Sequence, residues 1–411
     1  MAKWLARPST PTRRNSLGAG FWFLCAGTFI NRAGTMVVPF MTLYLVSARG
    51  FSVLAAGEVV AGFGAGALVA PLVGGALADH LGRRVTLLGS TLSTSAIMIA
   101  LAYARPAELI VVQVVTLGVT LEAPRPVAQA LVADLVPEHD RVRAYAALFW
   151  MGNLGFAVAM ASAGFLAQTG FAALFWTDAV TGVVFGALVW RFVPERARRH
   201  SSAGTESSGY RQILRHRAMV SFTLAVMTYY FVYLQSDSTL PLAVHRSGLP
   251  PHAYGFCMAL NGVLICIAQP LLAPRLGRCD PGRVWAAGVA LVGVGFALTA
   301  AASTTAGYLL SVAVWSIGEI FPATVSAAIV TRLAPEELRG RYSGLYGFAL
   351  ASGWLTSSIG GTRLLSLSPL LLWGTCATLS AVSAYGVHRL APKLRHADPD
   401  RLSNLTQART A

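Results

Sequence analysis

Twelve long apolar segments constrain the fold of this chain more than any other feature of its sequence. Each runs for about 20 residues or more, the length that an α-helix needs to cross a hydrocarbon core of roughly 30 Å. Only 12% of the side chains are charged, against roughly 25% in an ordinary soluble domain. We therefore predict an all-α integral membrane protein with twelve transmembrane helices, near residues 19–46, 53–78, 85–104, 107–136, 141–168, 171–193, 218–246, 251–274, 283–303, 306–334, 342–362 and 367–390.

The formal net charge of +15 would suit a nucleic-acid-binding protein, but its distribution indicates membrane topology instead. If both termini and every even-numbered connection lie in the cytoplasm, all but six of the 32 Lys and Arg residues lie on that side. Basic residues gather on the cytoplasmic side of membrane proteins, so the asymmetry predicts the orientation and requires no nucleic acid. The exceptions are Arg49, Arg105, Arg246 and Arg363 outside, and Arg32 and Arg125 within spans.

An internal repeat divides the chain into two halves. The motif "ADLVPEHDRVRAY" (133–145) ends the fourth span, and "TRLAPEELRGRYS" (331–343) ends the tenth, with matching Pro, Glu and Arg residues at a constant offset of 198. Such an offset is the length of one six-span unit. We predict a cytoplasmic tail over 1–18, six-helix bundles over 19–193 and 218–390, a basic cytoplasmic linker over 194–217 and a cytoplasmic tail over 391–411, with the first helix retained and not cleaved as a signal peptide.

A compact charged motif interrupts the apolar sequence between the second and third spans. The stretch "GGALADHLGRRVTLLGS" (74–90) resembles the signature of the major facilitator superfamily of secondary transporters, which also has six plus six spans and a central basic loop. Within that superfamily, "SIGEIFP" (316–322) and "LPLAVHRSGLPPHAYG" (240–255) are most similar to bacterial exporters of the drug:proton antiporter type. The fifth span lacks the Gly-Pro pair that such antiporters often contain.

The resemblance implies a cytoplasmic gate between the two halves. Asp79 would face the start of the eleventh helix near Arg341, where unsatisfied N–H groups attract an anion, and Arg83 would pair with Asp134. Glycines in the motif would let helices approach closely. Alternatively, the arginines act only as topology signals. The candidate gate residues are Gly75, Asp79, Gly82, Arg83, Arg84, Asp134, Arg141, Arg339 and Arg341.

Charged side chains inside the spans mark a candidate ion path. Each costs about 2.5–3.5 kcal/mol on insertion scales and so usually faces a cavity or a partner. They fall on the first, fourth, seventh and tenth spans, the helices that line the central cavity in the family that this sequence resembles. Glu122 and Glu319 lie at nearly equal depths, so we expect them to be pseudo-symmetry mates to within one position. The candidates for proton coupling are Arg32, Glu122, Arg125, Asp237 and Glu319.

Prolines predict interruptions of the fourth and tenth spans near these carboxylates. Pro124 and Pro126 remove two backbone donors and disfavour the α conformation at Ala123 and Arg125, and Pro322 lies in the corresponding part of the tenth span. Interrupted helices at matching places in two halves indicate a transporter binding site. The alternative is that each proline merely bends a packed helix.

The seventh span contains a candidate contact for a substrate. Tyr229, Tyr233 and Asp237 recur every four residues and share one helix face, and Gln235 lies among them. This aromatic stripe could equally be an interfacial belt. Asn261 could equally serve as a hydrogen bond between helices. Asp178 is a weaker candidate in the outer half of its span.

The two carboxylates at mid-span are expected to differ in role. Arg125 lies three residues from Glu122 and Arg32 can approach from the first span, so Glu122 should stay ionised and orient substrate or stabilise structure. Glu319 has no cation within one helical turn. Removal from water should therefore favour its neutral form, which makes it the better proton carrier.

These observations predict a secondary active transporter that works by alternating access. Proton-coupled efflux of small amphipathic compounds is the leading interpretation, with proton-coupled uptake of a metabolite and a transport-dead sensor as alternatives. No catalytic cluster, metal site or cofactor motif appears in the sequence, so we expect no enzyme, and a proton gradient as the energy source. We expect a monomer in the bacterial cytoplasmic membrane, with the lipid bilayer and a small-molecule substrate as partners.

Overall fold

The computed structural model describes residues 17–137, 140–192, 213, 215–335 and 338–395, and all elements in these residues are helices. The predicted linker 194–217 and both predicted tails fall largely outside the described residues. The first half contains α1 (Ala19–Gly34), α2 (Val37–Ser47), α3 (Val53–Leu81), α4 (Arg83–Tyr103), α5 (Ala107–Glu122), α6 (Pro124–Leu135), α7 (Arg141–Thr169) and α8 (Ala172–Phe192). The second half contains α10 (Arg217–Tyr233), α11 (Gln235–Ser238), α12 (Leu240–Arg246), α13 (Pro251–Leu276), α14 (Pro281–Thr299), α15 (Thr305–Leu333), α16 (Arg339–Leu367) and α17 (Pro369–Arg395).

Twelve spans are present, at the places that the sequence predicts. In the described part of the chain, ten helices are long and apolar enough to cross a membrane. The other two spans differ from these ten for visible reasons. The fourth is divided into α5 and α6, of 16 and 12 residues, each too short to cross alone, and the eleventh, α16, is rich in Gly, Ser and Thr.

The two halves repeat both the order and the packing of their helices. Corresponding helices begin at the predicted offset of 198, as in the pairs Ala19 and Arg217, Val53 and Pro251, Arg83 and Pro281, Ala107 and Thr305, and Arg141 and Arg339. In the first half Gly182 of α8 packs against Ser95 of α4, and in the second Ser380 of α17 packs against Gly293 of α14. The small and the larger residue have exchanged helices, but the contact is the same. The predicted pseudo-symmetry of the two bundles is confirmed.

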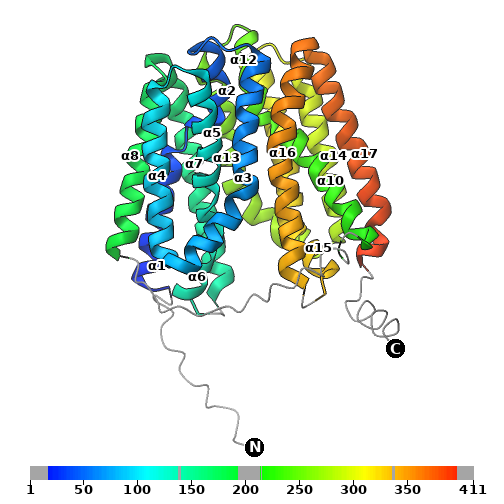
Figure 1. Ribbon diagram of the computed structural model, residues 1–411. Helices are drawn as coiled ribbons and strands as arrows, with labels where there is room; N and C mark the ends of the chain where they lie inside the picture. Colours follow the sequence, from blue (N-terminus) through cyan, green and yellow to red (C-terminus); the bar gives the residue numbers. More distant parts are fainter. Residues whose placement is uncertain (1–16, 138–139, 193–212, 214, 336–337, 396–411) are drawn as a thin grey trace, which may run out of the picture.

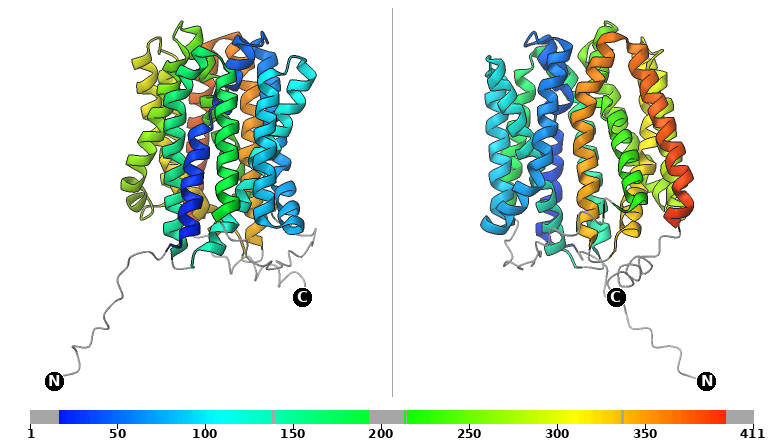
Figure 2. Two further views of the ribbon diagram at one scale, coloured as in Figure 1. Left: turned by 90° about the vertical axis from the view of Figure 1, so that its left-hand side faces the viewer. Right: turned by 45° about the vertical axis from the view of Figure 1, so that its right-hand side comes forward.

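The axes of the long helices lie roughly parallel, with successive helices alternating in direction, and α1 begins at the same end at which α17 ends (Figures 1 and 2). We call the end where α1 begins and α17 ends the tail end, and the opposite end the far end. Helices α4 and α8 lie at one edge of the molecule and α14 and α17 at the other, while α2 and α12 lie at the far end. The halves contact each other mainly through α3 with α16 and α7 with α13.

The contacts between the halves are closest toward the far end. A Cβ on Gly57 of α3 would lie 2.6 Å from the Ser358 carbonyl oxygen of α16, and one on Gly164 of α7 would lie 2.3 Å from the Cα of His252 in α13. Toward the tail end α3 becomes exposed, with Leu72 at 75% exposure. The described part of the chain therefore forms a molecule whose halves are joined at the far end and separate toward the tail end along α3 and α16.

The interruption predicted from the prolines is present in the fourth span, which is divided into α5 and α6 at Ala123, but not in the tenth. Ala123 keeps the α conformation (φ −57°, ψ −36°), Arg125 lies within α6, and α15 is one continuous helix through Pro322. The predictions of a non-helical Ala123 and Arg125 and of an interrupted tenth span are wrong, because a helix can accept the loss of a proline N–H by bending.

The first and seventh spans, like the fourth, are divided into separate helices. The first changes from α1 to α2 at Thr35 and Met36, and the seventh passes through the short α11 between Leu234 and Thr239. Prolines follow both breaks, Pro39 in α2 and Pro241 in α12. Polar groups near these breaks are therefore placed where backbone N–H and C=O groups need partners.

Candidate functional site

Glu319 lies at the middle of α15 and receives hydrogen bonds from two other helices. The Tyr233 hydroxyl of α10 donates to Oε1 at 2.7 Å, and the Asn261 amide of α13 donates to Oε2 at 2.9 Å. The same amide also donates to the Ser316 hydroxyl at 3.0 Å. Both donors to the carboxylate are uncharged, and the side chain is half-buried. Among the described residues, the hydrogen-bond partners of this mid-span carboxylate include no cation.

Aromatic rings border this carboxylate on one side. Tyr229 and Tyr233 stack with ring centres 5.7 Å apart and planes at 21°, and the edge of Trp315 meets Tyr233 at 6.0 Å. Tyr229 is 5% exposed, so it lies in the bundle and not in a surface belt. The stripe thus forms one wall of the Glu319 site.

The other seventh-span candidates lie nearer the far end. Asp237 is half-buried and accepts a hydrogen bond from Ser236 at 3.3 Å. Gln235 is fully buried, and its amide oxygen accepts from Ser238 at 3.2 Å and Thr239 at 2.7 Å. In this conformation Gln235 joins α11 to its neighbours and has no surface for a substrate.

In the first half, Arg32 lies beside the break in the first span. The Asp178 carboxylate of α8 accepts the backbone N–H of Val37, the first residue of α2, at 3.5 Å, and the positive charge of Arg32 acts on the same carboxylate. Asp178 is 5% exposed. An anion at the start of a helix satisfies its free N–H groups, so Asp178 holds α2 in place.

Glu122 ends α5, at the kink of the fourth span. The repeat places Glu122 opposite Ile320 rather than Glu319, and one residue corresponds to a rotation of about 100° around a helix. The prolines do coincide, since Pro124 corresponds to Pro322. The side chain of Arg125 lies outside the described residues, so its predicted pairing with Glu122 stays a prediction.

The glycines of the gate motif have separate roles. A Cβ on Gly74 would lie 2.3 Å from the Ala123 carbonyl oxygen, whereas one on Gly75 would meet nothing within 4 Å. Gly82 has a φ of 95° and connects α3 to α4, a conformation that a side chain disfavours. The close approach expected of the motif glycines is therefore made by Gly74 and not by Gly75.

The charged residues of the gate motif are spread along the tail end. Asp79 is exposed near the end of α3, and the described residues show no hydrogen bond donated to its carboxylate by the first turn of α16. The Arg84 guanidinium lies over the Trp190 ring, 4.4 Å from its centre, and Arg141 donates to the Val136 carbonyl at 3.4 Å. The side chain of Asp134 is not described, so its pairing with Arg83 stays a prediction. Arg339 and Arg341 lie in the first turn of α16.

Sequence reasoning underrated three residues of the site. Asn261 and Asp178 appeared only as weaker candidates, and Ser316 was not considered. A polar residue in an apolar span is a weak signal by itself, because hydrogen bonds between packed helices give the same pattern. Tertiary structure was needed to show that Asn261 serves Glu319 directly.

Comparison with known proteins gives the family of the chain. The family model described as Major Facilitator Superfamily matches residues 24–392. The uncharacterized MFS-type transporter YqjV of Bacillus subtilis is 23% identical and the alignment covers 83% of this chain and 85% of YqjV. The multidrug resistance protein MdtH of Aeromonas hydrophila is 25% identical over 89% of this chain and 93% of MdtH. A Na(+), Li(+), K(+)/H(+) antiporter of Planococcus maritimus is 23% identical over 79% and 83%.

The fold is also that of solved transporters. A POT peptide transporter crystallised with sulfate superposes with a TM-score of 0.76, at 16% identity, over 92% of this chain and 95% of the other. This likeness concerns the fold alone. Together with the twelve spans and the repeated halves, the match over most of the chain shows that the protein is a membrane transporter and belongs to the major facilitator superfamily.

Proposed function

We propose that this transporter exports small amphipathic compounds in exchange for protons. The observation that supports the proposal most is the surroundings of Glu319, a carboxylate at mid-span with uncharged donors and an aromatic wall. A carboxylate inside a span is costly to keep without a function and is typical of ion or proton paths. Aromatic faces attract organic cations and apolar rings.

Export and exchange are supported by the names of two relatives. One is a multidrug resistance protein and another is a cation/proton antiporter. The two halves of the molecule contact each other at the far end and separate toward the tail end. This arrangement fits one state of an alternating-access cycle. If the tail end lies in the cytoplasm, as the distribution of basic residues predicts, this state would accept substrate from inside the cell.

Transport by inside-out membrane vesicles tests the proposal, with ethidium fluorescence as the probe. Acidifying the vesicle interior should drive ethidium into the vesicles while protons leave, and nigericin should abolish the uptake by collapsing the gradient. Vesicles without the protein provide the control. Accumulation only when the outside is more acidic would support proton-coupled uptake into cells instead, and transport that ignores the gradient would contradict proton coupling.

A further inference from the structure

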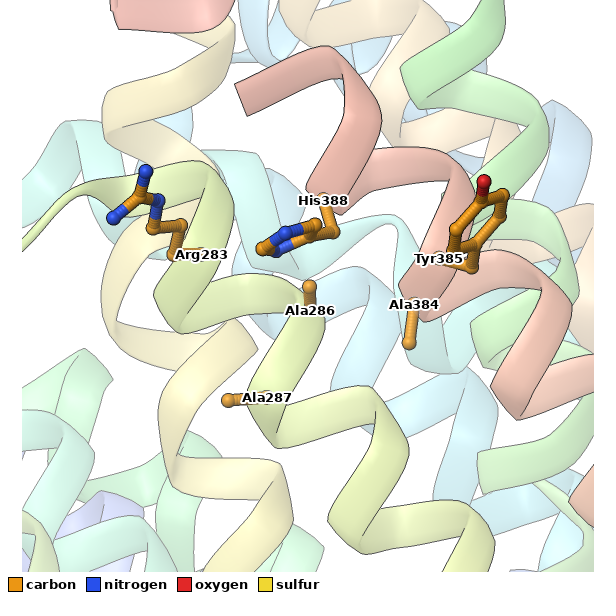
Figure 3. Close-up of a pocket in the computed structure, with 6 residues that line it drawn as sticks. All are labelled: Arg283, Ala286, Ala287, Ala384, Tyr385 and His388. Carbon is orange, nitrogen blue, oxygen red and sulfur yellow. The ribbon is translucent and has the colours of Figure 1, made fainter. Parts of the chain in front are cut away.

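A pocket lies on the surface of the second half, between the start of α14 and the last turns of α17 (Figure 3). Its volume is about 430 Å³. Both helices reach the tail end here, since α14 begins at Pro281 and the apolar part of α17 ends at Pro392. The pocket therefore lies where the hydrocarbon core meets the headgroups. Its lining residues are Arg283, Ala286, Ala287, Ala384, Tyr385 and His388.

The lining combines polar groups with an apolar floor. Arg283, Tyr385 and His388 are exposed, and Figure 3 shows His388 of α17 directed toward α14, between Arg283 and Tyr385. A guanidinium presents several N–H donors in a planar fork that matches a phosphate, and an imidazole adds another donor. The three alanines leave room for an acyl chain beside these donors.

The surrounding charges leave the pocket attractive to an anion. Arg389 lies beside it, with its guanidinium carbon 5.5 Å from the ring centre of Tyr385. The nearby carboxylate of Asp280 accepts the backbone N–H of Arg283 at 2.9 Å, so it is already engaged at the start of α14. A tyrosine at this depth is typical of the membrane interface.

The corresponding place in the first half is filled with apolar groups. Leu88 packs against Gly186, since a Cβ on that glycine would lie 3.5 Å from the leucine Cδ2, and Arg84 covers the ring of Trp190. The pocket is therefore a property of the second half and is not dictated by the fold. At the offset of the repeat, Val85, Leu88, Gly186 and Trp190 stand where the second half has Arg283, Ala286, Ala384 and His388.

We propose that this pocket binds an anionic phospholipid from the leaflet at the tail end. The phosphate would lie between Arg283 and His388, and an acyl chain would lie over the alanines. Basic pockets between transmembrane helices are a recognised mode of binding for acidic headgroups. Lipid binding in this pocket does not depend on which substrate is transported or on the direction of transport.

Native mass spectrometry of the full chain tests the proposal. The protein is released from vesicles of equimolar phosphatidylglycerol and phosphatidylcholine, and the lipids retained by each chain are counted. The wild-type protein should retain phosphatidylglycerol in preference to phosphatidylcholine. The double variant Arg283→Gln, His388→Gln should lose about fivefold or more of that preference. The control Arg143→Gln, Arg191→Gln removes two exposed arginines from the tail end of the first half and should keep it.

A second variant and a soluble probe make the result decisive. Ala286→Leu introduces the residue found at position 88, keeps both cationic groups and should also lower retention by filling the floor. This variant decides the question if the double variant fails to fold. Glycerol phosphate should not displace the lipid, because it has no acyl chain. Wild-type retention in both pocket variants, or full displacement by glycerol phosphate, would overturn the proposal.

Discussion

Single polar residues give the two halves different chemistry within one repeated fold. In the second half, Tyr233 and Asn261 donate hydrogen bonds to Glu319. In the first half, Asp178 accepts a hydrogen bond from the start of α2. The sequence predicted Glu319 as a functional carboxylate because a charge in an apolar span is rare. It could not predict the donors, because they come from helices that are distant in the chain.

Asp178→Ala should destabilise the first half, while Asp178→Asn should be milder. Alanine leaves the N–H of Val37 without its acceptor and removes the charge that Arg32 faces, and a lost buried partner costs about 1–3 kcal/mol. Asparagine keeps an acceptor oxygen. Thermal unfolding in detergent should therefore rank wild type above Asp178→Asn, and that variant above Asp178→Ala. Equal stability of the three proteins would show that Asp178 does not hold α2.

We expect the contact between His216 and Tyr342 at the tail end to weaken in acid. Its ring nitrogen lies 2.9 Å from the Tyr342 hydroxyl of α16, and burial lowers the pKa of His216 below its ordinary 6.5. As the pH falls through 6.5, the unfolded chain therefore binds more protons than the folded protein. The free energy of unfolding should decrease over this range and level off below the lowered pKa of His216. His216→Gln should flatten this loss in thermal unfolding, and the exposed His245→Gln should not. An unchanged pH profile in His216→Gln would exclude this residue as the cause.

Among the helices, the long spans and the break of the fourth span were predictable, whereas the breaks of the first and seventh spans were not. Apolar length and the offset of 198 predicted all twelve spans, since both are properties of the sequence. The first and seventh spans also break, and tertiary partners there satisfy the freed backbone groups, as Asp178 does for Val37. Pro322 has no such effect, since α15 stays continuous.

Gly57→Val tests the contact of α3 with α16 at the far end. Its Cβ would lie 2.6 Å from a backbone oxygen of Ser358, so the helices must separate and the far-end-closed state should lose population. Spin labels at the exposed positions Ser52 and Ser366, in a background with native cysteines replaced, should move apart. The control Gly89→Val meets nothing within 4 Å and should keep the wild-type distance. Unchanged distances in Gly57→Val would contradict this role for the glycine.

At the scale of the whole molecule, the basic residues predict that the tail end is cytoplasmic. Cys279 offers a native probe, since it is an exposed free cysteine between α13 and α14 at the tail end. A membrane-impermeant maleimide should label Cys279 in inside-out vesicles and leave it unlabelled in intact cells. Ser52→Cys at the far end should give the opposite pattern. Labelling of Cys279 in intact cells would reverse the orientation.

If Glu319 couples transport to protons, as we propose, paired transport assays of Glu319→Gln should separate proton-driven transport from exchange. Glutamine keeps an acceptor for Tyr233 but cannot carry a proton, so pH-gradient-driven accumulation of ethidium should be abolished while gradient-independent exchange of ethidium across the vesicle membrane persists. Glu58→Gln, which changes an exposed carboxylate on α3, should retain both activities. Gradient-driven accumulation at the wild-type rate in Glu319→Gln would show that Glu319 does not couple transport to protons.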